Sequence, residues 1–305
     1  MTDGALTLDR AYAICRAIAK REAKNFYYSF VALPAPRRNA ICAIYAFMRK
    51  ADDLSDDESF SRAARRHNLD AWLAAWHAAA AGGNTADPVF FAVRDAIQRF
   101  NIPLSLLDEL VAGTTMDLEN AAPNSGPDTY ATFEDLYRYC YLVASVVGLV
   151  CIRIFGYTDP RAEKFAEETG IAFQLTNILR DVQEDAERSR VYLPLEDLAV
   201  HNVKLESLLH RAPGTPPTQN ERALIAELAA RAERYYQSAQ QLMPLIDRES
   251  RPALWVLVTI YHRLLRRIEA ADYDVFSQRA SVPTVQKLSI LAVGMGRMAI
   301  ARLGL

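Results

Sequence analysis

Apolar residues recur at helical spacing along most of the chain. They repeat at every third or fourth position, the period of one face of an α-helix, while stretches that alternate with period two are few. Glycine and proline are sparse and scattered, with 12 and 14 among 305 residues. The pattern predicts an all-α protein, and because no break in composition divides residues 1–305, we expect a single domain. The predicted helices cover residues 7–24, 36–51, 59–81, 87–100, 104–120, 132–157, 221–248, 251–272 and 285–303.

The stretch at residues 174–194, QLTNILRDVQEDAERSRVYLP, carries an unusual polar stripe. If it is helical, Asn177, Asp181 and Asp185 follow one another at intervals of four residues and lie on one face. Two carboxylates and an amide on one stripe repel each other unless a cation lies between them. Mg²⁺ accepts such hard oxygen ligands while it keeps several waters and bridges to phosphate oxygens.

A second acidic stretch, RKADDLSDD at residues 49–57, repeats the spacing. Asp52 and Asp56 are four residues apart, as are Asp53 and Asp57. A single acidic pair of this kind usually belongs to a solvated helix face. Both stretches here follow strongly apolar helical runs, and solvated faces do not normally continue buried ones. The spacing leaves two interpretations open: two solvated faces, or one paired site for Mg²⁺ and a diphosphate.

Charge, cysteine usage and the N-terminus limit the class of protein. The net charge is −2, the estimated pI is about 6.2 and no large basic patch is visible, which argues against a nucleic-acid partner. The first residues lack the cationic start and apolar core of a signal peptide. The most apolar stretch, residues 141–157, is interrupted by Arg153 and is typical of a buried core helix rather than a membrane span.

The cysteines have no metal-ligand spacing, so we expect reduced core residues in a cytoplasmic protein. They are Cys15, Cys42, Cys140 and Cys151.

Two groups of residues are candidates for the wall of a pocket. The aromatic residues Phe26 and Phe30 in NFYYSF are either ordinary core or the wall of a pocket for a long apolar substrate. Ala144, Ser145 and Gly148 are small residues at helical spacing. Small side chains let another helix or a ligand approach closely, and close helix packing is the simpler explanation.

Tyrosines mark two of the predicted helices. The helix at 132–157 begins with a capping-box-like pair, Thr132 and Asp135. Near its start we expect four exposed tyrosines, Tyr130, Tyr137, Tyr139 and Tyr141. The helix at 251–272 carries Tyr261 beside a basic cluster, and Tyr261 is a further candidate for contact with a substrate. That cluster contains Arg263, Arg266 and Arg267.

Taken in order, these motifs resemble those of the squalene/phytoene synthase family. RKADDLSDD precedes NILRDVQED by about 125 residues, and NILRDVQEDAERSRVYLP is similar to the family's second acidic motif almost throughout. YRYCYLVASVVGL resembles the family's helix between the two acidic motifs, and NFYYSF-x-x-LP and YDVFSQRASV match its entry and exit segments. The resemblance covers about residues 10–290. It implies an isoprenoid synthase-type helical bundle around a deep central cavity, with one acidic motif on either side of the mouth.

The resemblance also implies head-to-head (1′-1) condensation of two prenyl diphosphates and a role for each matching residue. The expected Mg²⁺ ligands are Asp52, Asp56, Asn177, Asp181 and Asp185. The arginines expected to face the diphosphates are Arg49, Arg180, Arg188 and Arg190. The prenyl channels would be bordered by Phe26, Phe30, Ala144, Gly148 and Gln174. Tyr139 and Tyr192 match tyrosines near the reacting centres and, with Arg180, form the expected catalytic set. Ser145 departs from the glycine of many family members, and we expect it to narrow the channel locally.

The motif context favours a farnesyl diphosphate farnesyltransferase, which joins two C15 units through presqualene diphosphate and either stops there or continues to squalene with NADPH. The alternative within the family is a phytoene synthase acting on C20 units. No Gly-rich dinucleotide fingerprint is present, although the family would bind NADPH without one. An alternative of another class is a non-catalytic helical protein that binds a prenyl lipid. We also expect peripheral membrane contact for product release, with residues 285–305 as the candidate surface.

Overall fold

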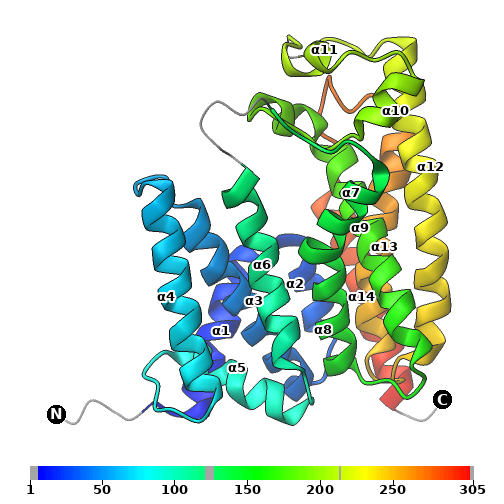
Figure 1. The fold of residues 1–305 in the computed structure, drawn as a ribbon. Helices are drawn as coiled ribbons and strands as arrows, with labels where there is room; N and C mark the ends of the chain where they lie inside the picture. The colour runs from blue at the N-terminus through cyan, green and yellow to red at the C-terminus, as the bar shows by residue number, and fades with distance from the viewer. Residues whose placement is uncertain (1–5, 121–126, 213, 303–305) are drawn as a thin grey trace.

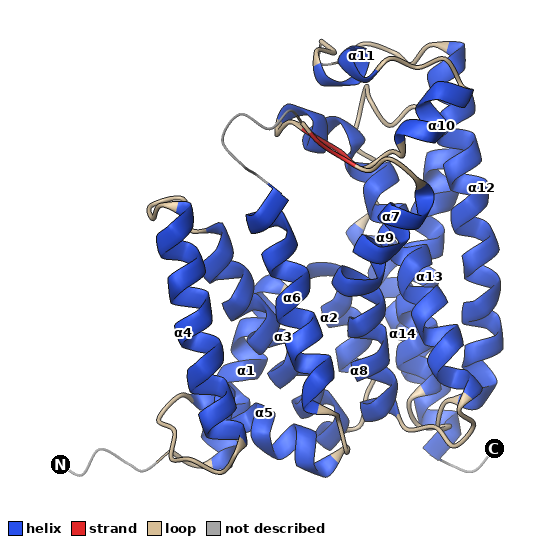
Figure 2. Ribbon diagram, viewed as in Figure 1, coloured by secondary structure: helices blue, strands red, loops and turns tan. Residues whose placement is uncertain are grey.

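Helices form almost all of the regular structure in the computed structural model, which describes residues 6–120, 127–212 and 214–302 (Figure 1, Figure 2). The described strands are β1 (Asp128–Thr129) and β2 (Arg190–Val191), which pair in parallel. This confirms the all-α class. The helices are α1 (Leu8–Glu22), α2 (Lys24–Val31), α3 (Ala35–Asp56), α4 (Arg62–Ala80), α5 (Pro88–Arg99), α6 (Leu104–Asn120), α7 (Phe133–Cys140), η1 (Tyr141–Ser145), α8 (Val146–Phe155), α9 (Arg161–Glu187), α10 (Leu195–Val200), α11 (Leu205–Leu209), α12 (Gln219–Leu242), η2 (Met243–Leu245), α13 (Arg251–Ala270) and α14 (Thr284–Arg302).

Helix starts follow ordinary capping chemistry. The side chains of Thr7, Ser61 and Asp87 accept hydrogen bonds from the first backbone N–H groups of α1, α4 and α5. Thr132 and Asp135 form the predicted capping box at the start of α7. The polar residues between the apolar runs therefore set where these helices begin.

Two predicted helices differ from the structure. The run at 132–157 is not one regular helix, because η1 is a five-residue π-helical segment between α7 and α8. The helix predicted for 221–248 ends at Leu242, since Pro244 lacks the N–H that would continue it and a 3₁₀ turn follows. The acidic stretch at 174–194 is helical only as far as Glu187.

Helix α9 is packed against α12, η1, α8 and α13. Two adjoining groups of buried residues meet along it, one centred on α1, α3 and α5 and the other on α9, α12 and α13. Trp72 and Trp76 pack with Phe47 and Phe90, as expected of core aromatics. The four cysteines are free, and all but Cys151 are fully buried. The core thus surrounds the helix that carries the second acidic motif.

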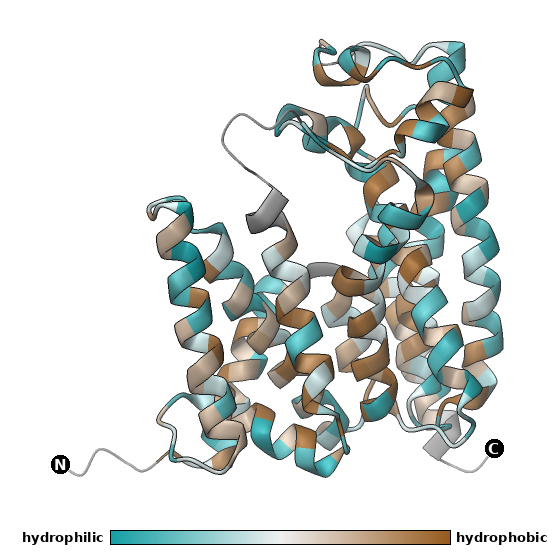
Figure 3. Cartoon of the chain, viewed as in Figure 1, coloured by the Kyte–Doolittle hydropathy of each residue, from teal (hydrophilic) through white to brown (hydrophobic). Residues whose placement is uncertain are grey.

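The helical run Phe133–Phe155 has the length and composition of a helix that is able to cross a membrane. It packs against α9 and α6 within the bundle, and Figure 3 shows that α8 is apolar over most of its length. Its packing accounts for that apolar character, as in the core helices of other proteins.

Candidate active site

A cavity of about 410 Å³ lies between α2, α3, η1, α8, α9 and α13. Each of α3 and α9 lines it with a single face, because the lining positions recur in the i, i+3, i+4 pattern of one side of a helix. The positions from α3 are Ile41, Ile44, Tyr45, Met48 and Asp52. Those from α9 are Ala166, Thr169, Gly170, Phe173, Gln174, Asn177 and Arg180.

The cavity is apolar along most of its length and polar at one end. On α3 the last lining residue is Asp52, and on α9 the last two are Asn177 and Arg180. The opposite end is closed by aliphatic and aromatic side chains that include Ile41 and Phe155. The cavity is therefore shaped for a long apolar chain with a polar, anionic head.

All the side chains predicted to border prenyl chains line this cavity. They are Phe26, Phe30, Ala144, Gly148 and Gln174, and Tyr261 joins them. The expectation for Ser145 is wrong. It is fully buried, its hydroxyl donates to the Glu167 carbonyl oxygen at 2.7 Å, and it is not among the lining residues, so it does not narrow the cavity.

Aromatic rings form a cluster near the polar end. The ring of Tyr261 stacks on Phe173 with centroids 4.6 Å apart and lies 5.6 Å from the ring of Phe26. Burial raises the pKa of Tyr261 to about 12, so its hydroxyl stays protonated at neutral pH. These rings provide a π surface beside the polar end of the cavity.

Asp181 is held by two arginines from different parts of the chain. Arg180 Nε donates to its carboxylate at 2.7 Å, and Arg279 Nε donates from the segment before α14 at 2.8 Å. Arg279 also pairs with Glu184 at 3.2 Å. Burial would raise the pKa of Asp181, but the hydrogen bonds from Arg180 and Arg279 outweigh it and keep the pKa below its usual range.

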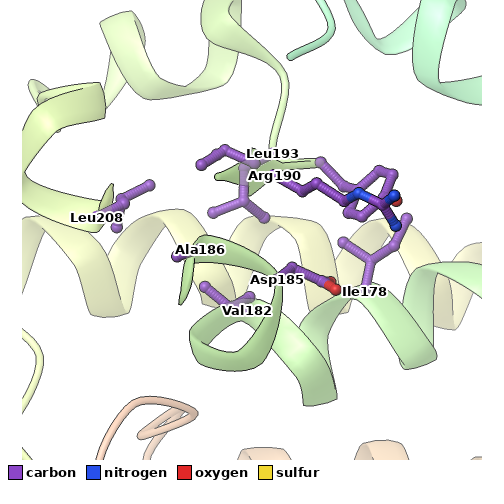
Figure 4. A pocket seen from close by; sticks show the side chains of 9 residues that line it. Ile178, Val182, Asp185, Ala186, Arg190, Leu193 and Leu208 are labelled. Atoms are coloured by element: carbon purple, nitrogen blue, oxygen red, sulfur yellow. The ribbon is translucent and has the colours of Figure 1, made fainter. Parts of the chain in front are cut away.

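The surroundings of Asp185 shift its pKa in the opposite direction to that of Asp181. It lines a separate, water-sized pocket, where its carboxylate and the Arg190 side chain extend toward the same side (Figure 4). Burial and the negative charge of Asp181 raise its pKa to about 7, and Arg190 and Arg188 offset only part of that rise. A carboxylate in this position would be stabilised by an additional cation.

Tyr139 and Tyr192 come together although 53 positions separate them in the sequence. Their rings stack with centroids 5.0 Å apart, and Tyr130 packs against both. Tyr192 lines the same small pocket as Asp185. The prediction that the tyrosines near the start of α7 are exposed is wrong, because Tyr139 is buried and the others are partly buried.

Like Asp181, Asp185, Tyr139 and Tyr192, the remaining predicted residues are not among those that line the cavity. Arg49 pairs with Asp53 at 2.6 Å on α3, and Asp56 is exposed in the last turn of that helix. Arg188 is exposed at the C-terminal end of α9. Arg190 in β2 approaches Asp128 at 3.8 Å.

The predicted Mg²⁺ ligands nevertheless offer the carboxylate and amide oxygens that suit this ion. Among the described residues, no group of three or more His, Cys, Asp and Glu side chains is gathered into a ready metal cluster. However, the Asn177 side-chain oxygen is buried without a hydrogen-bond partner while its nitrogen donates to Gln174 at 3.3 Å. A buried, unsatisfied oxygen beside carboxylates suits a hard cation that keeps several waters and shares its other ligands with a diphosphate.

Sequence reasoning missed two cations at the polar end, Arg279 and Lys287. Arg279 binds Asp181, and the pKa of Lys287 is lowered by burial and by the positive charge of Arg180. Both lie in or next to the segment YDVFSQRASV, which the sequence marks as a family motif. A lone basic residue in a connector has no periodicity that would reveal its target, so only the fold identifies these two.

The chain is similar to several known proteins. Residues 19–286 match the family described as squalene/phytoene synthase. The chain is 34% identical to a phytoene synthase from Arthrospira platensis, covering 95% of this chain and 94% of that one. It is 35% identical to a 15-cis-phytoene synthase from Synechococcus elongatus, covering 96% and 95%. A dehydrosqualene synthase structure superimposes with a TM-score of 0.81 at 29% identity, covering 96% of this chain and 98% of that one. The squalene synthase HpnC from Alicyclobacillus acidocaldarius has a TM-score of 0.78 at 26% identity, covering 88% and 96%.

Proposed function

Since the chain belongs to the squalene/phytoene synthase family, we propose that it is a phytoene synthase, which joins two C20 geranylgeranyl diphosphates head to head. The support for C20 substrates is that the two relatives above, similar over nearly the whole chain, are phytoene synthases. These relatives favour the phytoene synthase hypothesis, which the sequence offered as the alternative, over the farnesyl diphosphate farnesyltransferase hypothesis. Members of the family are prenyltransferases that act on prenyl diphosphates.

The observation that supports the proposal best is the apolar cavity that ends in Asp52, Asn177 and Arg180. The lining positions of α9 extend over fifteen residues, from Ala166 to Arg180, which corresponds to ~21 Å of helix. A prenyl chain of C15 or C20 is long, apolar and capped by a diphosphate, so it matches both the length and the polarity of this cavity.

The residues at the polar end suit diphosphate departure. Arg180, Arg279 and Lys287 supply positive charge from α9, the connector and α14. When bound, Mg²⁺ would supply Lewis-acid stabilisation to the leaving diphosphate. The residues that would hold it are Asp52, Asp56, Asn177, Asp181 and Asp185. Fixed charges aimed at the leaving group lower the barrier to ionisation, because they need no rearrangement as charge develops.

The apolar part of the cavity would protect the allylic cation. Phe26, Phe173 and Tyr261 offer ring faces that stabilise positive charge and exclude water. Tyr139 and Tyr192 are the proposed tyrosines of the reacting centre. Joining the two C20 units would break two carbon–oxygen bonds and release two diphosphates. Loss of two protons, one from C1 of each unit, would supply the electrons for the new C1=C1′ double bond of the C40 triene. This route consumes no reductant, so we propose that NADPH is not required.

A second candidate is a C15 synthase of the squalene or dehydrosqualene type. The structural similarity to a dehydrosqualene synthase and to HpnC favours it. The two candidates share the polar end and differ in the length of the chain that the apolar end accepts.

A product assay tests the proposal. Purified protein is incubated with Mg²⁺ and either geranylgeranyl or farnesyl diphosphate, with and without NADPH, and extracts are analysed by mass spectrometry. We expect a C40 product from geranylgeranyl diphosphate that does not depend on NADPH. A C30 product or its cyclopropyl diphosphate from farnesyl diphosphate alone would support the second candidate instead.

Matched variants separate catalysis from lipid binding. We expect Asp52→Asn and Asp181→Asn to lower turnover at least about a hundredfold, because each removes a carboxylate that would hold the Mg²⁺ that stabilises the leaving diphosphate. Asp70→Asn is the control, since Asp70 is exposed and pairs only with Arg66 on α4. No turnover of either substrate by the wild-type protein would favour the non-catalytic prenyl-lipid-binding alternative.

A further inference from the structure

The outward face of α14 is apolar. Among the described residues there are seven exposed large hydrophobic side chains, and four of them lie on this helix: Val285, Leu288, Val293 and Met295. Val285 is 77% exposed and Leu288 is 51% exposed. The exposed apolar residues form a stripe along the helix with intervals of three and four residues. It consists of Val285, Leu288, Ala292, Met295 and Ala299. A helix in contact only with water would be expected to carry charges on this face.

The opposite face of α14 is fixed to the bundle. Ile290 and Met298 are buried, and a Cβ on Gly294 would meet Val256 of α13 at 2.4 Å. The helix packs against α13 and α2, and Figure 1 shows it in red beside α13. Both α2 and α13 also line the cavity. The exposed stripe therefore lies on a rigidly held helix that is separated from the cavity by one layer of helices.

The charged residues of α14 itself all have one sign. Residues 284–302 contain no Asp or Glu. The guanidinium of Arg297 lies 4.0 Å from the ring centre of Trp255 on α13. Trp255 also lines a groove of about 540 Å³ between α12 and α13, which contains exposed Arg263 and apolar Val258.

We propose that this surface, consisting of the α14 stripe together with Trp255, Arg263 and Arg297, docks onto an anionic lipid bilayer. An apolar helix face bordered by tryptophan and arginine is the arrangement found where a helix lies in the interface of a membrane. Arginines at its edge are attracted to anionic headgroups.

A second copy of the chain fits this surface less well than a bilayer does. A two-fold interface places the same patch of both subunits together. Arg297 and Arg263 would then approach their own copies without an acidic partner from α14. An anionic bilayer instead complements that charge.

Vesicle flotation tests the proposal. We expect wild-type protein to float with vesicles of phosphatidylcholine and phosphatidylglycerol, and to float less with phosphatidylcholine alone. Leu288→Glu with Met295→Glu should lower the partition coefficient at least about tenfold, because the two changes place charge in the apolar stripe. The matched control is Phe60→Glu with Val200→Glu, which makes the same chemical change at two exposed positions away from α14. We expect the control to bind like the wild type.

Tryptophan fluorescence gives an independent readout. Lipids with brominated chains should quench Trp255, and Trp255→Phe should abolish the quenching because Trp76 is buried and Trp72 packs against Phe47 on the far side of the bundle from α14, which contacts α13 and α2. The proposal is overturned if wild-type protein does not bind anionic vesicles, or if the α14 variant binds as well as the control. It is also overturned if the wild type is a dimer that the α14 variant dissociates, since the face would then be covered by a second copy. None of these outcomes depends on which prenyl diphosphate is the substrate.

Discussion

At the scale of single residues, the clearest contrast is between Asp181 and Asp185. They lie one turn apart on the same face of α9, and their spacing alone assigns them the same role. The structure gives them different surroundings. Arg180 and Arg279 neutralise Asp181, whereas Asp185 is partly buried and lies near the negative charge of Asp181. In the absence of Mg²⁺, the two arginines stabilise the ionised form of Asp181, whereas the ionised form of Asp185 is destabilised.

Asp185→Asn should therefore stabilise the metal-free protein at pH 8. The pKa of Asp185 in the folded protein, about 7, lies above its value of about 4 in the unfolded chain. Between these two pH values the unfolded state has lost the proton that the folded state keeps, so the free energy of unfolding falls as pH rises. Ionised Asp185 thus lowers the free energy of unfolding above pH 7 and has no such effect near pH 4. We expect a gain on the order of 1 kcal/mol at pH 8, reduced from the full shift because the group is partly exposed.

Urea denaturation at pH 8 and near pH 4 measures this effect, with Asp70→Asn as the exposed control. Equal stabilities of wild type and Asp185→Asn at both pH values would contradict the assignment. We expect the same variant to lose Mg²⁺-dependent turnover, so stability and activity should change in opposite directions.

At the scale of elements, the contact of η1 with α9 shapes the middle of the cavity. A Cβ on Gly170 would lie 2.6 Å from the Ser145 Cα, so only glycine lets the two backbones approach this closely. Gly170 and Ala144 both line the cavity at this level. The π-helical segment therefore lies where the cavity wall consists largely of backbone, in keeping with the frequent occurrence of such segments at functional sites.

Gly170→Ala should destabilise the protein by about 1–3 kcal/mol, because the added methyl group must displace the backbone of η1. Chemical denaturation measures the loss. Gly296→Ala is the matched control, since no heavy atom lies within 4 Å of its added Cβ and alanine favours a helix. A Gly170→Ala protein as stable as the control variant would show that η1 yields without strain.

At the scale of the whole molecule, the polar end of the cavity is assembled from distant parts of the chain. Asp52 comes from α3, Asn177 and Arg180 from α9, and Arg279 from the connector before α14. The arginines and carboxylates partly neutralise one another in the absence of ligand. A metal ion and a diphosphate together would replace these internal pairs without leaving net charge buried.

Mg²⁺ and inorganic pyrophosphate together should raise the melting temperature more than either does alone. At a ligand concentration of 100 times Kd, linkage predicts a stabilisation of about 2.7 kcal/mol. Differential scanning calorimetry measures the shift, and the Asp52→Asn, Asp181→Asn double variant should show little of it. An equal rise with pyrophosphate alone would mean that the arginines bind the anion without the metal.

The sequence by itself determined the helical class, most helix boundaries and several residues of the cavity wall. Helical periodicity and capping are local, so Asp52, Asn177 and Arg180 were predictable, as were Phe26, Phe30, Ala144, Gly148 and Gln174 through the family motifs. Only the tertiary structure decided which arginine neutralises which carboxylate. Arg279 reaches Asp181 across 98 positions, and Tyr139 stacks on Tyr192. The π-helical segment and the burial of Ser145 likewise depend on the approach of α9 at Gly170. Electrostatics and close packing depend on distances through space, and a pattern along the chain does not contain those distances.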